Sequence, residues 1–286
     1  MDHATYCAEL VRKFDYQRYL SVLYAPSDKR AGLLAIYAFS LEVARIRELV
    51  SEALPGQMRL QWWRDALTGE GHGAVKDNPV AGALLETIGA FDLPREPMLN
   101  LLDAREFDLF NDPMPDQETL EGYAGETSSS LIQLAALILD RTLSGTVFAD
   151  SCGHGGVAYA MVGLVRALPW HAARQQCFLP QDLLERHGVS MVQMHRGEMT
   201  PELGAALREV LVHAQMHYDK AISAMASVSI EAGAAFLPVM LVPKQIDRLS
   251  REKMNYLQPL ESEGPLRSHI SMWRAARRLR SVMQPA

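Results

Sequence analysis

The chain has few cysteines and no long apolar run. Its three cysteines, Cys7, Cys152 and Cys177, lie far apart and form no CxxC pair, which argues against a disulfide framework and against a zinc knuckle. No apolar stretch of the sequence is long enough to cross a bilayer. The first residues, Met1 to Thr5, show neither the charged-then-apolar pattern of a signal peptide nor an Arg-rich transit segment. These features predict a cytoplasmic protein that is not processed.

The sequence also lacks an excess of positive charge. Its formal net charge is −6, which argues against a broad nucleic-acid surface because phosphate contacts need clustered Lys and Arg. The exception is the C-terminal region, where Arg274, Arg277, Arg278 and Arg280 follow Trp273. These arginines either complement the dipole of a last helical turn or form a basic amphipathic foot for a membrane surface or an acidic partner.

Several catalytic and cofactor motifs are missing. The sequence contains no P-loop, HExxH motif, nucleophile elbow or kinase signature. The Gly-rich residues 152–156 lack both a preceding strand and the spacing of a dinucleotide-binding loop. His213 and His217 have the i, i+4 spacing of a metal-binding pair, but no third ligand is evident nearby. A solvated or core pair is therefore the simpler interpretation of these two histidines.

Helical periodicity extends through most of the chain, whereas period-2 alternation is nearly absent. It predicts helices over about 29–50, 57–67, 79–90, 94–109, 118–139, 151–168, 201–227, 232–249 and 266–282. One face of the first helix is expected to carry Leu33, Tyr37, Leu41, Ala44 and Glu48, and Pro169 is expected to end or kink the helix that begins at Ser151. No repeat or linker divides the sequence, so we predict one all-α domain over residues 1–286, of a kind that can enclose a central cavity.

Three stretches of the chain resemble a known family. They are residues 16–48, the run Gly122-Tyr123-Ala124-Gly125-Glu126-Thr127, and residues 163–189, which include Pro169-Trp170-His171. Their order and spacing resemble those of the squalene/phytoene synthases. The resemblance implies a single-domain, all-α isoprenoid-synthase fold and an activity that joins two prenyl diphosphates head to head.

The resemblance also implies a magnesium clamp, which this sequence does not keep. Magnesium ions in such enzymes bridge the departing diphosphate to carboxylates spaced at i and i+4 on two helices. The corresponding positions here are Ala44, Arg45 and Glu48 in one run and Ala167 and His171 in the other, so that Glu48 alone is acidic. We therefore expect no catalytic residue and no cofactor, with Glu48 as the single candidate metal ligand. Magnesium is expected only if the chain is nevertheless a transferase.

One branch of this family, the phytoene-synthase-like assembly factors of mitochondrial complex I, lacks the same aspartates. Residues 39–42, 50–52, 58–63 and 164–171 resemble that branch most. The resemblance implies a non-catalytic role in assembling respiratory NADH dehydrogenase, with complex I subunits or assembly intermediates as partners, or binding of a lipid or isoprenoid. It also implies a peripheral position at a bacterial inner membrane. The alternative is a divergent transferase that condenses prenyl diphosphates.

Ten residues are candidates to line the expected cavity. Glu48 either binds a ligand or takes part in a buried ion network with nearby arginines. Arginines could bind a diphosphate or lipid headgroup without metal because guanidinium matches phosphate geometry, with internal ion pairing as the alternative. His171 is expected to be a core or loop-anchoring histidine, with metal ligation as the alternative. The full set is Tyr37, Leu41, Ala44, Arg45, Glu48, Tyr123, Arg166, Ala167, His171 and Arg174.

Overall fold

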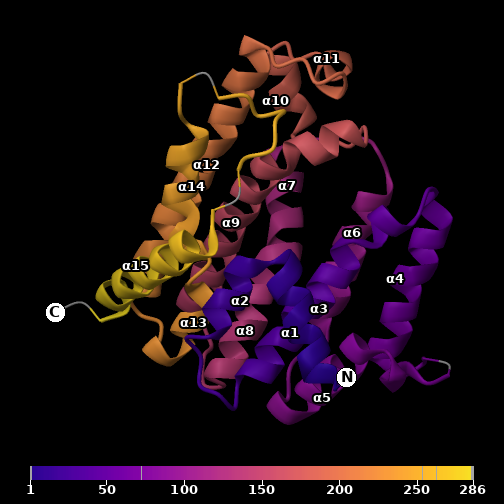
Figure 1. Ribbon diagram of the computed structural model, residues 1–286, viewed down its shortest axis with the longest axis vertical. Helices are drawn as coiled ribbons and strands as arrows, with labels where there is room; N and C mark the ends of the chain where they lie inside the picture. The colour runs from indigo at the N-terminus through magenta and orange to yellow at the C-terminus, as the bar shows by residue number, and fades with distance from the viewer. Residues whose placement is uncertain (1, 72, 253, 262, 285–286) are drawn as a thin grey trace.

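The structure is a computed structural model that describes residues 2–71, 73–252, 254–261 and 263–284. All regular elements within these ranges are helices (Figure 1), as the sequence predicts. The α-helices are α1 (His3–Phe14), α2 (Tyr16–Val22), α3 (Arg30–Ala44), α4 (Ala53–Thr68), α5 (Pro79–Phe91), α6 (Glu96–Arg105), α7 (Gln117–Ala124), α8 (Ser130–Leu139), α9 (Thr146–Ala173), α10 (Gln181–Arg186), α11 (Met191–His195), α12 (Pro201–Met225), α13 (Gly233–Phe236), α14 (Val242–Leu249) and α15 (Pro265–Met283). The predicted span 1–286 also includes Met1 and the last two residues, which lie outside the described ranges.

Helix α9 forms the centre of the molecule. It lies beside α12 along much of its length, and α8 with the preceding π-helical turn, Gly125–Ser129, packs on it as well (Figure 1). Gly125, Thr127 and the three serines at 128–130 are small residues, and this turn approaches α9 so closely that Gly156 of α9 has no room for a side chain against Ser129. The sequence therefore encodes a close contact at the core by placing small residues on both partners.

Two of the helix boundaries that differ from the prediction affect the expected site. Helix α3 ends at Ala44, and the chain continues as a 3₁₀ turn, Ile46–Leu49, in which the Glu48 amide donates to the Arg45 carbonyl at 3.0 Å. This tighter turn moves Glu48 off the face that carries Tyr37 and Leu41. The second difference is that α9 passes through Pro169 to Ala173. Burial of Leu168 and Ala172 on either side of the proline offsets the missing backbone bond.

Helix α4 begins earlier than the sequence suggests. Leu54-Pro55-Gly56 is a break in the sequence prediction, yet α4 begins at Ala53 and contains all three residues. Proline is tolerated in a first helical turn because its missing N–H would have no partner there. The break therefore lies before Ala53, at the extended residues Val50 and Glu52.

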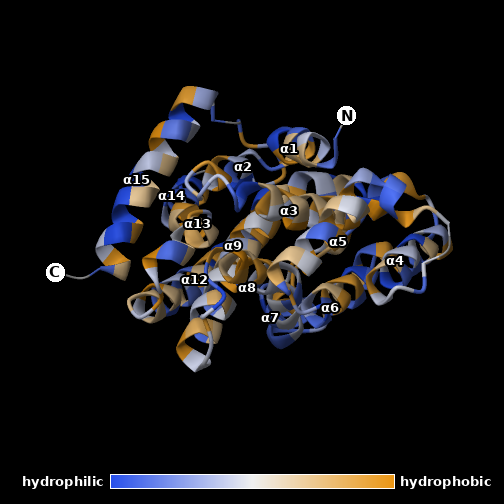
Figure 2. Cartoon of the chain, turned by 90° about the horizontal axis from the view of Figure 1, so that it is seen from below, coloured by the Kyte–Doolittle hydropathy of each residue, from blue (hydrophilic) through white to orange (hydrophobic). Residues whose placement is uncertain are grey.

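Apolar residues concentrate on the inward faces, and α15 lies at the periphery. Figure 2 shows hydrophobic residues along α8, α9 and α13, while α15 alternates hydrophilic and hydrophobic positions at one edge of the molecule. Helix α15 buries Met272, Ala275, Leu279 and Met283 against the core. Among the described residues, no helix is both long and apolar enough to span a membrane.

Candidate functional site

An open cavity of about 560 Å³ lies where α2, α9, α14 and α15 meet. Its apolar wall includes Leu20, Leu241 and Met272, and its polar wall includes Arg166, Lys244, Gln245 and Arg248. The residues at its rim include Phe14 and Trp170, which are 43% and 49% exposed. A cavity with an apolar wall and a few convergent polar groups has the character of a ligand site.

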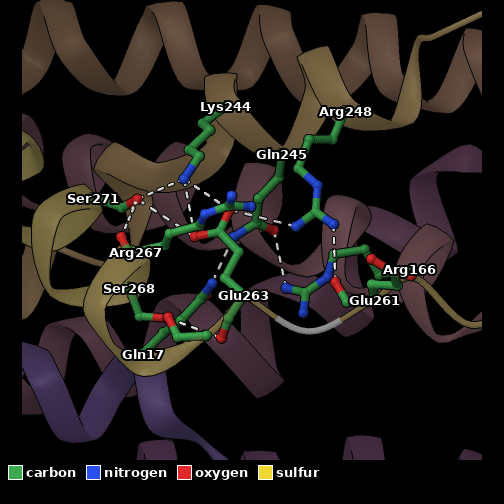
Figure 3. Close-up of polar contacts among 11 residues, drawn as sticks. Gln17, Arg166, Lys244, Gln245, Arg248, Glu261, Glu263, Arg267, Ser268 and Ser271 are labelled. Carbon is green, nitrogen blue, oxygen red and sulfur yellow. Dashed lines mark hydrogen bonds and ion pairs between the residues drawn. The ribbon is translucent and has the colours of Figure 1, made fainter.

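A carboxylate from the segment before α15 binds two cations of this cavity (Figure 3). Lys244 Nζ lies 2.7 Å from Glu263 Oε1, and Arg248 Nη1 lies 3.4 Å from the same oxygen. Lys244 and Ser271 both contact Oε2 of the same carboxylate. Burial opposes ionisation of Glu263, but the hydrogen bond and charge of Lys244, with Arg248, lower its pKa below the usual value. Glu263 thus holds a negative charge at a basic site.

Arg166 lies on the α9 wall without a carboxylate partner among the described residues. Its Nη1 donates to Gln245 Oε1 at 3.1 Å, and Gln245 Nε2 donates to Gln17 Oε1 at 3.2 Å. These amides hold the guanidinium at the cavity but leave its charge uncompensated. An anionic group entering from solvent would therefore meet three cations, Arg166, Lys244 and Arg248, against the single carboxylate of Glu263.

The structure brings only two of the ten predicted residues to this cavity. Arg166 and Ala167 line it. Arg45, Glu48 and Arg174 instead form a separate ion cluster, with Glu48 Oε2 3.3 Å from Arg45 Nε and Glu48 Oε1 3.1 Å from Arg174 Nη1. The guanidinium of Arg45 also stacks 3.9 Å from the centre of the Phe14 ring. The structure therefore pairs Glu48 with arginines, but these side chains are 32–45% exposed and do not form the buried network that the sequence left open.

Tyr37 and Leu41 lie on the inner side of α3. Arg18, which is buried, places its guanidinium 5.3 Å from the Tyr37 ring and 5.1 Å from the Tyr159 ring. Burial raises the pKa of both tyrosines to about 12. Leu41 and Ala44 are half-buried on the same helix. The aromatic residues here enclose a structural arginine, and of this group Tyr159 also lines the cavity.

Tyr123 belongs to a buried cluster that sequence reasoning missed. Its hydroxyl donates to Asp108 Oδ1 at 2.7 Å, and Arg105 Nη1 donates both to Asp108 Oδ2 at 3.0 Å and to the Tyr123 hydroxyl at 2.7 Å. Gln176 ties the backbone carbonyl of Asp108 to the loop after α9 at 2.9 Å. An aspartate in the otherwise apolar stretch 107–110 is the sequence signal that could have indicated this cluster.

The residues at the five clamp positions do not fit magnesium. Ala44 and Ala167 offer no oxygen ligand, and Arg45 neutralises the one acid, Glu48. His171 is a nitrogen ligand, and its ring packs 4.5 Å from that of Phe178. Magnesium requires oxygen ligands in near-octahedral geometry, so no reaction step through a metal can be derived from these side chains.

His171 makes a testable contribution to stability. Burial, with the charges of Arg174 and Arg105, lowers its pKa from 6.5 to about 4. Between these values the unfolded chain binds more protons than the folded chain, so stability falls as the pH drops from 6.5 to 4. We expect His171→Phe to flatten the pH dependence of the unfolding free energy over this window, by at most about 3 kcal/mol. Identical urea-denaturation profiles for both proteins across these pH values would contradict the prediction.

Comparisons with known proteins agree with this architecture. The squalene/phytoene synthase family model matches residues 11–274. NADH dehydrogenase (ubiquinone) complex I, assembly factor 6 of Rattus norvegicus is 32% identical over 96% of this chain and 83% of its own length. Presqualene diphosphate synthase of Sinorhizobium fredii is 23% identical over 70% of this chain and 71% of its own length.

Solved structures confirm the predicted fold. A crystal structure of a dehydrosqualene synthase in complex with ligand superimposes with a TM-score of 0.82 at 17% identity, covering 98% of this chain and 97% of that one. The predicted all-α isoprenoid-synthase fold is therefore correct. On the match to residues 11–274 and the similarity to assembly factor 6, this chain belongs to the squalene/phytoene synthase family, in the branch of the complex I assembly factor 6 homologues.

Proposed function

We propose that this chain is a non-catalytic member of its family that acts in the assembly of respiratory complex I. Two observations support the proposal together. The relatives named as complex I assembly factors match nearly its whole length, and the clamp positions 44, 45, 167 and 171 carry Ala, Arg, Ala and His. Its partners would be complex I subunits or assembly intermediates, met at the cytoplasmic surface of the membrane.

The assembly role is tested in the host cell. Deleting the gene should lower both assembled complex I on native gels and NADH:quinone oxidoreductase activity of membranes. Expression of the intact chain in the deletion strain should restore both. Succinate:quinone oxidoreductase activity, which does not depend on complex I, serves as the control. Normal complex I in the deletion strain would rule out the proposed role.

The transferase alternative has its own test. Purified protein incubated with farnesyl or geranylgeranyl diphosphate and magnesium should form no condensed product, because positions 44, 45, 167 and 171 supply no carboxylate. Formation of such a product would overturn the non-catalytic part of the proposal while leaving the assembly role open to the genetic test.

The cavity supports an additional binding role for an anionic amphiphile, such as a prenyl phosphate or a lipid. Arg166, Lys244 and Arg248 supply cations that need no metal, and Leu20, Leu241 and Met272 supply apolar surface. A farnesyl diphosphate analogue should therefore bind with the same affinity in magnesium and in EDTA. Arg166→Ala should weaken this binding about tenfold, whereas Arg141→Ala, at an exposed pair with Asp92, should not. Binding that requires magnesium would contradict this role.

Helix α15 supports a peripheral membrane contact. Leu266, Ile270 and Trp273 follow i, i+4, i+7 spacing on its outer face, and 75%, 41% and 51% of these side chains are exposed. Arg277 lies one turn further along this face, with its guanidinium carbon 5.0 Å from the centre of the Trp273 ring. Arg274 directly follows Trp273 in the helix. An apolar stripe flanked by arginines matches an anionic bilayer surface.

We expect the change of Leu266, Ile270 and Trp273 to serine to reduce binding to anionic liposomes at least tenfold, because the apolar anchor is lost. Co-sedimentation with phosphatidylglycerol vesicles measures it, and the unfolding midpoint should hardly change. The matched control is Val212→Ser with Met216→Ser, two exposed apolar positions on α12. Equal binding of the α15 variant and the control would contradict this contact. Point changes are preferable to truncation at Trp273, since α15 also covers the core.

A further inference from the structure

Two histidines face each other across the central pair of helices. His154 lies on α9 and His217 on α12, and their Nδ1 atoms are 3.0 Å apart. The rings are inclined at 60° with their centres 5.0 Å apart. His217 is buried and His154 is partly exposed, so one side of the pair is open to solvent. The sequence spacing indicated His217 and His213 as a pair. The structure instead pairs His217 with His154 of the neighbouring helix α9.

A carboxylate behind His217 orients its ring. Glu121 of α7 places Oε1 3.5 Å from His217 Nε2, and Gln117 donates to the same oxygen at 3.0 Å. This contact favours the tautomer that carries its proton on Nε2, which leaves the Nδ1 lone pair directed at His154. A histidine held by a carboxylate through its second nitrogen is the usual arrangement at protein metal sites.

Charges of both signs lie near the pair. Lys220 is the strongest charge acting on His154, and the negative charges of Asp150 and Glu121 oppose it. Burial is the largest influence on both histidines and lowers the pKa of each.

We propose that His154 Nδ1 and His217 Nδ1 form a binding site for a late first-row divalent metal ion, copper(II) or nickel(II). With metal–nitrogen bonds of about 2.1 Å, their separation of 3.0 Å corresponds to a nitrogen–metal–nitrogen angle of about 90°. That angle is the one between neighbouring ligands in the square-planar geometry that these ions prefer. Among the described residues no group of three or more His, Cys, Asp or Glu converges on one point, so water from the open side would complete the coordination.

The test is metal titration, after EDTA treatment, of the full, tag-free chain and its variants in a His3→Ala background, which removes the copper(II) and nickel(II) site that a free amino terminus forms with a histidine at position 3. Isothermal titration with copper(II) should show one site, and the electron paramagnetic resonance spectrum should show coupling to two imidazole nitrogens. His217→Gln should weaken binding at least a hundredfold, and Glu121→Gln about tenfold through loss of ring orientation. His213→Ala, one turn away on α12, is the matched control and should bind as the unchanged protein does.

Three results would overturn the site. The first is unchanged affinity and stoichiometry in the double variant His154→Gln, His217→Gln, provided that its circular dichroism spectrum is that of the unchanged chain. The second is a spectrum of the unchanged chain with coupling to fewer than two nitrogens. Loss of binding in His213→Ala but not in His154→Gln would equally reject the pair and place the metal on α12 alone. Copper binds most sites more tightly than nickel or zinc. The comparison of variants, and not the comparison of metals, therefore decides whether His154 and His217 form the site.

Discussion

Replacing Asp108 with alanine is expected to lower the free energy of unfolding by about 3–5 kcal/mol. The Asp108 carboxylate accepts from the Arg105 guanidinium at 3.0 Å and from the Tyr123 hydroxyl at 2.7 Å, and all three side chains are buried or nearly so. Alanine would leave the charge of Arg105 buried without a counter-charge. The cost of an uncompensated buried charge exceeds that of losing a surface contact.

Urea denaturation followed by circular dichroism measures this effect. The matched control is Asp103→Ala, which removes the carboxylate that lies 2.7 Å from Arg64. Asp103 is largely exposed, and its loss should cost less than about 1 kcal/mol because solvent screens the pair. The loss in unfolding free energy for Tyr123→Phe should lie between those of the two aspartate variants, because this change removes the tyrosine hydroxyl but keeps the ion pair of Asp108 and Arg105. Equal costs for the Asp108 and Asp103 changes would show that the buried cluster is not a main source of stability.

The fold could be predicted from the sequence because its signals are local and repeated. Helical spacing of apolar residues extends over most of the chain, and the family motifs at 16–48 and 163–189 fix the order of the helices. The boundaries at Ala44 and Pro169 could not be predicted because tertiary packing decides them. Leu168 and Ala172 keep α9 helical through the proline, against its local preference.

The candidate site was harder to predict because its polar groups meet only in the folded chain. Glu263 reaches Lys244 and Arg248 from a segment with no helical pattern, and Arg166 meets Gln245 across 79 positions of sequence. The family motif drew attention to Glu48 and His171 instead. Those two positions hold ion pairs and aromatic packing, whereas Arg166 and Ala167 of the same motif line the open cavity.

The largest packing effect is expected at Gly156. A side-chain carbon at this position would overlap both the side chain and the backbone of Ser129, which belongs to the π-helical turn against α9. Backbone atoms cannot move aside as the end of a flexible side chain can, so Gly156→Ala must separate α9 from this turn. We expect a loss of at least about 3 kcal/mol in the free energy of unfolding, at the upper end of the range for overpacked cores.

Gly153→Ala provides the matched control on the same helix. A carbon at position 153 would meet nothing within 4 Å, so this change should stabilise α9 by about 0.5–1 kcal/mol through the lower backbone entropy of alanine in the unfolded chain. The expected changes in unfolding free energy have opposite signs for the two variants. This difference distinguishes the effect of the close contact at Gly156 from a general effect of replacing glycine in α9. If thermal unfolding shifted in the same direction for both variants, the approach of the π-helical turn to α9 would not be as close as the structure has it. Because α9 also carries Arg166 and Ala167, the Gly156 change should weaken ligand binding in the cavity as well, whereas Gly153→Ala should leave it unchanged.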